Sequence, residues 1–166
     1  PYDKTWPLTF AEEKNFLNNT IGSWLFGSIE HVGSTAVPNL MAKPVIDMMV
    51  GVKSLDASEP AIKVLMDNGY QYAPYKKTVM HWFCKPFDSF RTHHLHLVPY
   101  ESNLWQERLR FRDLLRTDES IAKKYEILKI DLATKYSSDR EAYTENKTPF
   151  IQQALKEASG KRLSGA

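Results

Sequence analysis

The chain has 166 residues, of which 42% are hydrophobic and 25% charged, and its formal net charge is +2 at pH 7. This composition is typical of a soluble globular domain, and so small a net charge gives no support for nucleic acid or an acidic membrane as a partner. The one cysteine, Cys84, excludes an internal disulfide and a cysteine-based metal cluster. No stretch approaches the ~20 apolar residues of a membrane span. The amino terminus also lacks the basic-then-apolar order of a secretion signal, so we expect a soluble cytoplasmic protein.

The first half of the chain reads as a helix followed by two strands. Apolar residues at helical spacing predict a helix over residues 8–21, with Thr9 as its N-cap. A strand over residues 24–32 follows. The next strand, residues 45–52, is apolar on both faces apart from Asp47, so we expect it to lie centrally in a sheet and to be covered on both sides.

The rest of the chain passes from mixed to helical structure. The pattern predicts, in order, a helix over 54–68, strands over 79–85 and 90–98 joined by a turn at 86–89, and helices over 103–157. Ser54 or Asp56 would cap the first of these helices, and Met66 belongs to its predicted buried stripe. Asp118 and Asp139 would cap later helices. We therefore expect a small sheet with two helices, followed by a helical carboxy-terminal part.

A Gly-Ser turn ends the strand over residues 24–32. Gly33 and Ser34 offer backbone N–H groups and a hydroxyl, which suit a phosphate oxygen, and Thr35 follows as a further candidate for the same role. Ordinary turns also favour Gly and Ser, so a purely structural turn is the alternative.

The carboxylate of Asp47 needs an explanation, because an unpaired buried charge is costly. Such a group is normally received by a metal, a cation or a hydrogen-bond network, and Asp47 is therefore the candidate catalytic residue. Side chains alternate along a strand, so Asp47 shares its face with Met49. A two-metal site would require a carboxylate at that second position, and methionine cannot supply one. A structural pair with Arg or Lys is the alternative.

A run of histidines lies in the strand over residues 90–98. His94 and His96 would project to one face and His93 to the other. The His-x-His spacing suits Zn, Mn or Fe, because neutral imidazole binds these metals well. Histidines that merely line a cavity are the alternative. Val98 occupies the place of a third histidine, which weakens the reading as a histidine-triad hydrolase.

Three basic residues are candidates for neutralising phosphate charge. Lys43 precedes the strand of Asp47, Arg91 leads into the histidine strand, and Lys147 lies in the helical part. Most other basic residues, Arg108 among them, are expected on solvated helix faces.

Five blocks together resemble one protein family. The stretch HVGSTAVPNLMAKPVID, residues 31–47, closely resembles the signature of the GrpB (UPF0157) family, and four later blocks match in order: RTHHLHLV, LRFRDLLR, KYEILKIDLATKY and DREAYTENKTPF. The family is placed in the nucleotidyltransferase superfamily. The resemblance implies one domain over residues 1–166, with a nucleotidyltransferase-like mixed β-sheet core flanked by helices over 1–100 and a helical part over 101–160.

The resemblance also implies a site. In that superfamily a Gly-Ser pair precedes a strand with two acids one residue apart, and a later strand supplies a third acid. Gly33, Ser34 and Asp47 match this pattern, whereas the second acid falls on Met49. The third acid would fall on the histidine strand, at position 94 or 96.

These observations lead us to expect nucleotide or phosphate-ester binding in a cleft, with metal-dependent nucleotidyl transfer to an unidentified acceptor as the candidate reaction. Asp47, with His94 and His96, would ligate a divalent metal, Mg or Mn or else Zn. The sequence leaves open whether the chain is an enzyme and what its oligomeric state is. The alternatives are a non-catalytic nucleotide-binding module and a metal-dependent hydrolase that uses the same three residues.

Overall fold

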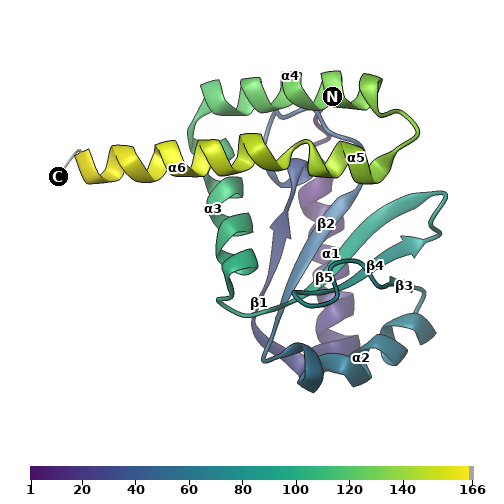
Figure 1. Ribbon diagram of the computed structural model, residues 1–166. Coiled ribbons are helices and arrows are strands. Elements are labelled where there is room, and N and C mark those ends of the chain that lie inside the picture. The colour runs from purple at the N-terminus through teal and green to yellow at the C-terminus, as the bar shows by residue number, and fades with distance from the viewer. Residues whose placement is uncertain (165–166) are drawn as a thin grey trace. The chain divides into compact units, whose positions relative to one another are not determined.

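The computed structural model describes residues 1–164 and is built around one mixed sheet (Figure 1). The chain divides into two compact units, Pro1–Leu109 and a second that begins at Arg110, within helix α3 (Asn103–Thr117). The predicted mixed α/β fold is confirmed. The predicted division into a core over 1–100 and a helical part over 101–160 stays a prediction.

The sheet of the first unit has five strands in the order β1-β2-β5-β4-β3. Their bounds are β1 Leu25–Val32, β2 Ile46–Val52, β3 Gln71–Ala73, β4 His81–Pro86 and β5 Arg91–Pro99. β2 and β5 are parallel, and the other neighbours are antiparallel. The central position predicted for β2 is confirmed, and two short 3-10 turns, Gly22–Trp24 and Ser34–Ala36, flank β1.

The register of β2 and β5 decides which polar residues meet. Asp47 lies beside His94 and Met49 beside His96, so these four residues share one face of the sheet. His93 pairs with Ile46 and belongs to the other face. The predicted alternation of the histidines is therefore confirmed.

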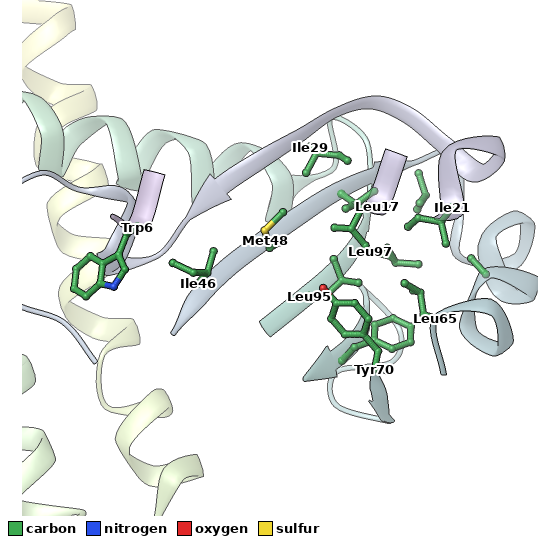
Figure 2. Packing of buried hydrophobic residues seen from close by; sticks show 14 residues of the cluster. Trp6, Leu17, Ile21, Ile29, Ile46, Met48, Leu65, Tyr70, Leu95 and Leu97 are labelled. Atoms are coloured by element: carbon green, nitrogen blue, oxygen red, sulfur yellow. The ribbon is translucent and has the colours of Figure 1, made fainter. Parts of the chain in front are cut away.

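Helices α1 (Trp6–Ile21) and α2 (Leu55–Asp67) cover the face that does not carry Asp47. Figure 2 shows the buried side chains of this core, with Leu17 and Ile21 of α1 near Leu97 of β5. Burial of an apolar side chain contributes about 1.5–3 kcal/mol, so this layer holds the sheet in place.

Two details of these helices differ from the predictions. The N-cap of α1 is Thr5, without a side-chain cap bond, and Thr9 lies inside the helix, where its hydroxyl donates to the Thr5 carbonyl at 3.2 Å. Pro7 lies in the first turn, where its missing N–H costs nothing, and this lets the helix begin earlier than predicted. In α2 the buried stripe runs through Ala61 and Leu65. Met66 is 52% exposed, because the residue next to Leu65 along a helix points to a different side, here toward solvent.

Ser54 caps α2 as predicted, because its hydroxyl accepts a hydrogen bond from the Ala57 amide at 3.0 Å. We expect Ser54→Ala to lower the free energy of unfolding by about 1 kcal/mol, measured by urea denaturation. Thr5→Ala is the matched control, since Thr5 makes no side-chain cap bond. An equal loss in both variants would show that the cap bond contributes nothing.

The second unit continues α3 and contains α4 (Glu119–Lys135), α5 (Arg140–Glu145) and α6 (Thr148–Ser164). Asp118 and Asp139 cap α4 and α5 as predicted, through bonds of 3.0 and 2.9 Å to backbone amides. Helix α5 and helix α6 are separated by residues 146–147. Pro149 is tolerated only in the first turn of a helix, so a new helix begins just before it. Within residues 1–164 no helix has both the length and the apolar character needed to cross a membrane.

Candidate functional site

Four polar side chains of the first unit meet on the face of the sheet that carries Asp47. His94 Nδ1 lies 3.0 Å from the Asp47 carboxylate, and His96 Nε2 lies 3.7 Å from the same oxygen. Arg108, from α3, places its Nη1 3.0 Å from His96 Nδ1. The structure thus brings together three residues predicted for the site, and a guanidinium joins them. We call this group the Asp47 cluster.

The hydrogen bonds fix which ring nitrogens carry protons. A guanidinium only donates, so His96 Nδ1 accepts from Arg108, and the proton of the neutral His96 ring is on Nε2, facing Asp47. A carboxylate only accepts, so His94 Nδ1 carries a proton. The lone pair of a neutral His94 ring is then on Nε2, which is buried and has no hydrogen-bond partner.

Burial and charge set the protonation of the cluster. Burial by itself would raise the pKa of Asp47, but the hydrogen bond from His94, together with the nearby His96 ring, outweighs it and holds that pKa well below its usual range. Burial, with the charge of Arg108 beside the ring, lowers the pKa of His96 to about 3. At neutral pH the cluster therefore contains an ionised carboxylate, a neutral His96 and a cationic Arg108.

Gly33 lies directly against the carboxylate of Asp47. Its backbone has φ 72° and ψ −173°, a region that only glycine adopts readily. A Cβ built there would clash with Asp47 Oδ2. The Gly-Ser turn and the acidic strand are therefore in contact, as a shared site requires.

Gly33→Ala should displace the Asp47 carboxylate and lower the free energy of unfolding by about 1–3 kcal/mol, the usual cost of such backbone strain. Gly22→Ala is the matched control, because Gly22 has φ −53° and nothing within 4 Å of the added Cβ. Chemical denaturation measures both variants. Equal stability of the two would contradict the contact between Gly33 and Asp47.

The other residues of the predicted phosphate turn are placed differently. Thr35 is buried, and its hydroxyl donates to the Val45 carbonyl at 3.2 Å and accepts from His31 Nε2 at 2.9 Å. These bonds tie the turn to the start of β2, which is a structural role. Ser34 is half-buried beside Gly33.

The predicted cations lie at different places. Arg91 packs its guanidinium 4.9 Å from the ring centre of Trp82, and the Trp82 ring lies 5.2 Å from that of His94. Arg91 also pairs with Asp88. Lys43 is exposed in the loop before β2. Lys147 belongs to the second unit, where its ammonium lies 4.5 Å from the Tyr143 ring centre.

The predicted metal site does not fit this arrangement. The one lone pair of a neutral His96 ring accepts from Arg108, so it is not directed at an ion shared with Asp47. Met49, in the place of the second acid, is fully buried. Across the described part of the chain, no three His, Cys, Asp or Glu side chains form a group that could hold a metal ion. Metal ligation by Asp47, His94 and His96 together stays a prediction.

Two residues of the site were not predicted. Arg108 was expected on a solvated helix face, but it is half-buried against His96 and Met80. The position of Arg108 could have been inferred from Trp105, which lies three residues earlier and therefore on the same face of the helix. Trp105 is buried against this side of the sheet. Trp82 lies in the strand predicted over residues 79–85 but was not a candidate for the site, although its register with His96 places it on the same face.

Comparison with known proteins identifies the family. The family model described as GrpB protein matches residues 1–157. The chain belongs to the GrpB family. It is 35% identical over 161 residues to the glutamate-rich protein GrpB of Alkalihalophilus pseudofirmus, covering 94% of this chain and 92% of that protein. It is also 32% identical over 157 residues to a UPF0157 protein of Bacillus subtilis, covering 95% of this chain but 46% of that protein.

A solved structure supports the same assignment and the fold. The crystal structure of the conserved protein GrpB from Enterococcus faecalis has a TM-score of 0.82 at 32% identity, covering 98% of this chain and 97% of that chain. The resemblance to GrpB seen in the sequence is therefore confirmed over nearly the whole chain of this GrpB-family protein.

Proposed function

We propose that this GrpB-family chain binds a nucleotide or another phosphate ester at the Asp47 cluster. The observation that carries the proposal is His94 Nε2, a buried ring nitrogen without a partner, in a cluster that also contains a guanidinium. An orphaned buried polar atom costs about 1–3 kcal/mol, which a bound ligand would offset. Arg108 supplies positive charge for a phosphate oxygen.

The surroundings of the cluster support this class of ligand. Gly33 is in contact with the carboxylate, and Arg91 is held over Trp82, next to His94. Side-chain exposures of 28% for Asp47 and 23% for His94 leave the cluster open to solvent at one side. The resemblance to the nucleotidyltransferase superfamily supports a nucleotide in particular.

One of the relatives adds a further argument. A 73-residue stretch of the chain is 37% identical to part of a dephospho-CoA kinase of Mycobacterium bovis, and the match covers 18% of that protein. A segment similar to part of this chain thus occurs within a protein named as a dephospho-CoA kinase, which agrees with the phosphate-bearing ligand proposed here.

A non-catalytic nucleotide-binding module is the second candidate. It is favoured by Met49, whose fully buried side chain stands where a second metal-binding acid would be needed. Nucleotide turnover separates the two candidates: an enzyme consumes a bound nucleotide, and a module releases it unchanged.

Thermal stabilisation by ligands tests the proposal. With ATP, GTP, CTP or UTP and Mg²⁺ at about 100 times the dissociation constant, a true ligand should stabilise the protein by about 2.7 kcal/mol. Arg108→Gln should weaken binding about 10- to 100-fold, because it removes a charge-assisted hydrogen bond of about 1.5–3 kcal/mol.

The control for this test lies on the same helix. Arg110 is exposed on α3, so Arg110→Gln should leave the affinity unchanged. Binding that is unaffected by Arg108→Gln, or no stabilisation by any nucleotide or simple phosphate ester at millimolar concentration, would sink the proposal.

A further inference from the structure

We propose that His94 Nε2 is a nucleophile that takes a phosphorus group from the bound nucleotide and holds it as a covalent intermediate. This inference rests on the proposed function, since it requires a nucleotide at the Asp47 cluster. It goes further by assigning a reacting atom and a type of chemistry to the cluster.

The His94 ring is held in one orientation. Its Nδ1–H donates to Asp47 at 3.0 Å, and the Trp82 ring lies against it with the ring centres 5.2 Å apart. β5 is paired on both sides, by β2 and β4, so the backbone that carries the ring is fixed as well. The lone pair on Nε2 therefore points in one direction, as a nucleophile requires.

Asp47 supplies the charge that such a step needs. When Nε2 forms a bond to phosphorus, the ring becomes cationic, and a carboxylate at Nδ1–H stabilises that cation. The hydrogen bond from His94 and the nearby His96 ring keep the pKa of Asp47 well below the usual range, so the carboxylate is ionised at neutral pH. Arg108, on the other side of the cluster, can stabilise the negative charge that develops on the departing phosphate oxygen.

The neighbouring histidines lack this combination. The free nitrogen of neutral His96 accepts from Arg108, so its lone pair is already used. His93 lies on the opposite face, where its Nε2 is 3.9 Å from Glu13, and its Nδ1 is 2.9 Å from the Thr92 hydroxyl. On β5 only His94 has both a carboxylate at Nδ1 and an unpartnered Nε2 at the Asp47 cluster.

Covalent catalysis also agrees with the absence of a carboxylate at position 49. Direct transfer between two substrates in a two-metal site needs a second carboxylate, and Met49 stands in its place. A nucleophilic side chain divides the transfer into two steps, neither of which needs that carboxylate.

The step balances without an oxidant or a reductant. The Nε2–P bond forms as the bond between that phosphorus and its bridging oxygen breaks. Attack at the α-phosphorus of a nucleoside triphosphate releases pyrophosphate, and attack at the γ-phosphorus releases the nucleoside diphosphate. The proton on Nδ1 stays in its bond to Asp47. In the second step an acceptor hydroxyl or water takes the group, gives its proton to solvent and restores the free Nε2.

Radioactive labelling tests this inference on the full chain. The protein is incubated with Mg²⁺ and a nucleoside triphosphate that stabilises it, labelled at the α- or the γ-phosphorus. We expect protein-bound label that survives alkali and is lost in acid, as a phosphorus–nitrogen bond to imidazole behaves. Label from the α position identifies nucleotidyl transfer, and label from the γ position alone identifies phosphoryl transfer. Tandem mass spectrometry of the wild-type protein should map the group to His94.

Variants provide the controls. His94→Asn should lose the label, whereas His93→Asn, one residue away on the opposite face, should keep it. Melting temperatures check that both variants fold, and the mapping on wild-type protein does not depend on them. A nucleotide that binds but leaves no label, or label at another residue, overturns the inference and spares the proposed function. Absence of nucleotide binding overturns both.

Discussion

Lowering the pH from 7 to 4.5 should destabilise the fold by about 2.5 kcal/mol through His96 alone. Burial and Arg108 lower the pKa of His96 to about 3 in the folded protein, against an ordinary value of 6.5. The unfolded chain therefore binds a proton that the folded chain does not, and each pH unit between about 6.5 and 3 costs about 1.36 kcal/mol. Below about pH 3.8 the fold also loses the stabilisation that comes from the depressed pKa of Asp47, which adds to this effect.

The measurement is urea denaturation between pH 4.5 and 7, comparing wild type with His96→Gln. We expect the variant to show a clearly flatter dependence of unfolding free energy on pH, whatever its stability at pH 7. His93, whose pKa is lowered by burial, contributes a slope of the same sign and remains in the variant. Parallel curves for the two proteins would show that His96 is not held neutral by its burial and by Arg108.

Much of the fold and part of the site follow from local patterns. The apolar run around Asp47 identified a central strand, and the alternation along β5 put His94 and His96 on one face, where the structure brings them to Asp47. These inferences hold because strand periodicity determines which side chains share a face. The resemblance to GrpB then related the strands to one known family.

What the patterns missed depends on tertiary contacts. Arg108 reaches His96 because α3 packs against the sheet, and the charge pattern of that helix does not predict this packing. The three residues of β3 are too few for a periodicity to emerge. The direction of the His96 lone pair could not be predicted for a related reason, since it depends on the guanidinium of Arg108, which comes from another element.

A second polar cluster, on the opposite face of the sheet, should contribute strongly to stability. Glu13 of α1 accepts from the Tyr70 hydroxyl at 2.5 Å and from the Lys85 ammonium at 2.6 Å, and all but 9% of its side chain is buried. Lys85 also lies 5.0 Å from the Tyr70 ring centre. These contacts connect α1 to β4 on the face of the sheet that α1 covers.

Removing one partner of a buried ion pair typically costs about 3–5 kcal/mol, because the other charge stays behind unpaired. We expect about 3 kcal/mol for Glu13→Leu, at the low end, since 22% of the Lys85 side chain is exposed and can reach water. The double variant Glu13→Leu/Lys85→Met replaces both charges by apolar groups and should recover about 1–2 kcal/mol of the loss. Urea denaturation at pH 7 measures all three proteins.

The exposed pair Lys63–Asp67 is the matched control, because its ions are also 2.6 Å apart but its side chains are 81% and 60% exposed. Asp67→Ala should cost no more than about 0.5 kcal/mol, as exposed pairs on a helix do. The two pairs differ in burial and not in distance. A large loss of unfolding free energy for Glu13→Leu with a small one for Asp67→Ala would therefore assign the stabilisation to the buried contacts of α1. Equal small losses would mean that α1 is held by its apolar residues alone. A double variant no more stable than Glu13→Leu would show that the unpaired Lys85 charge is not the cause of the loss.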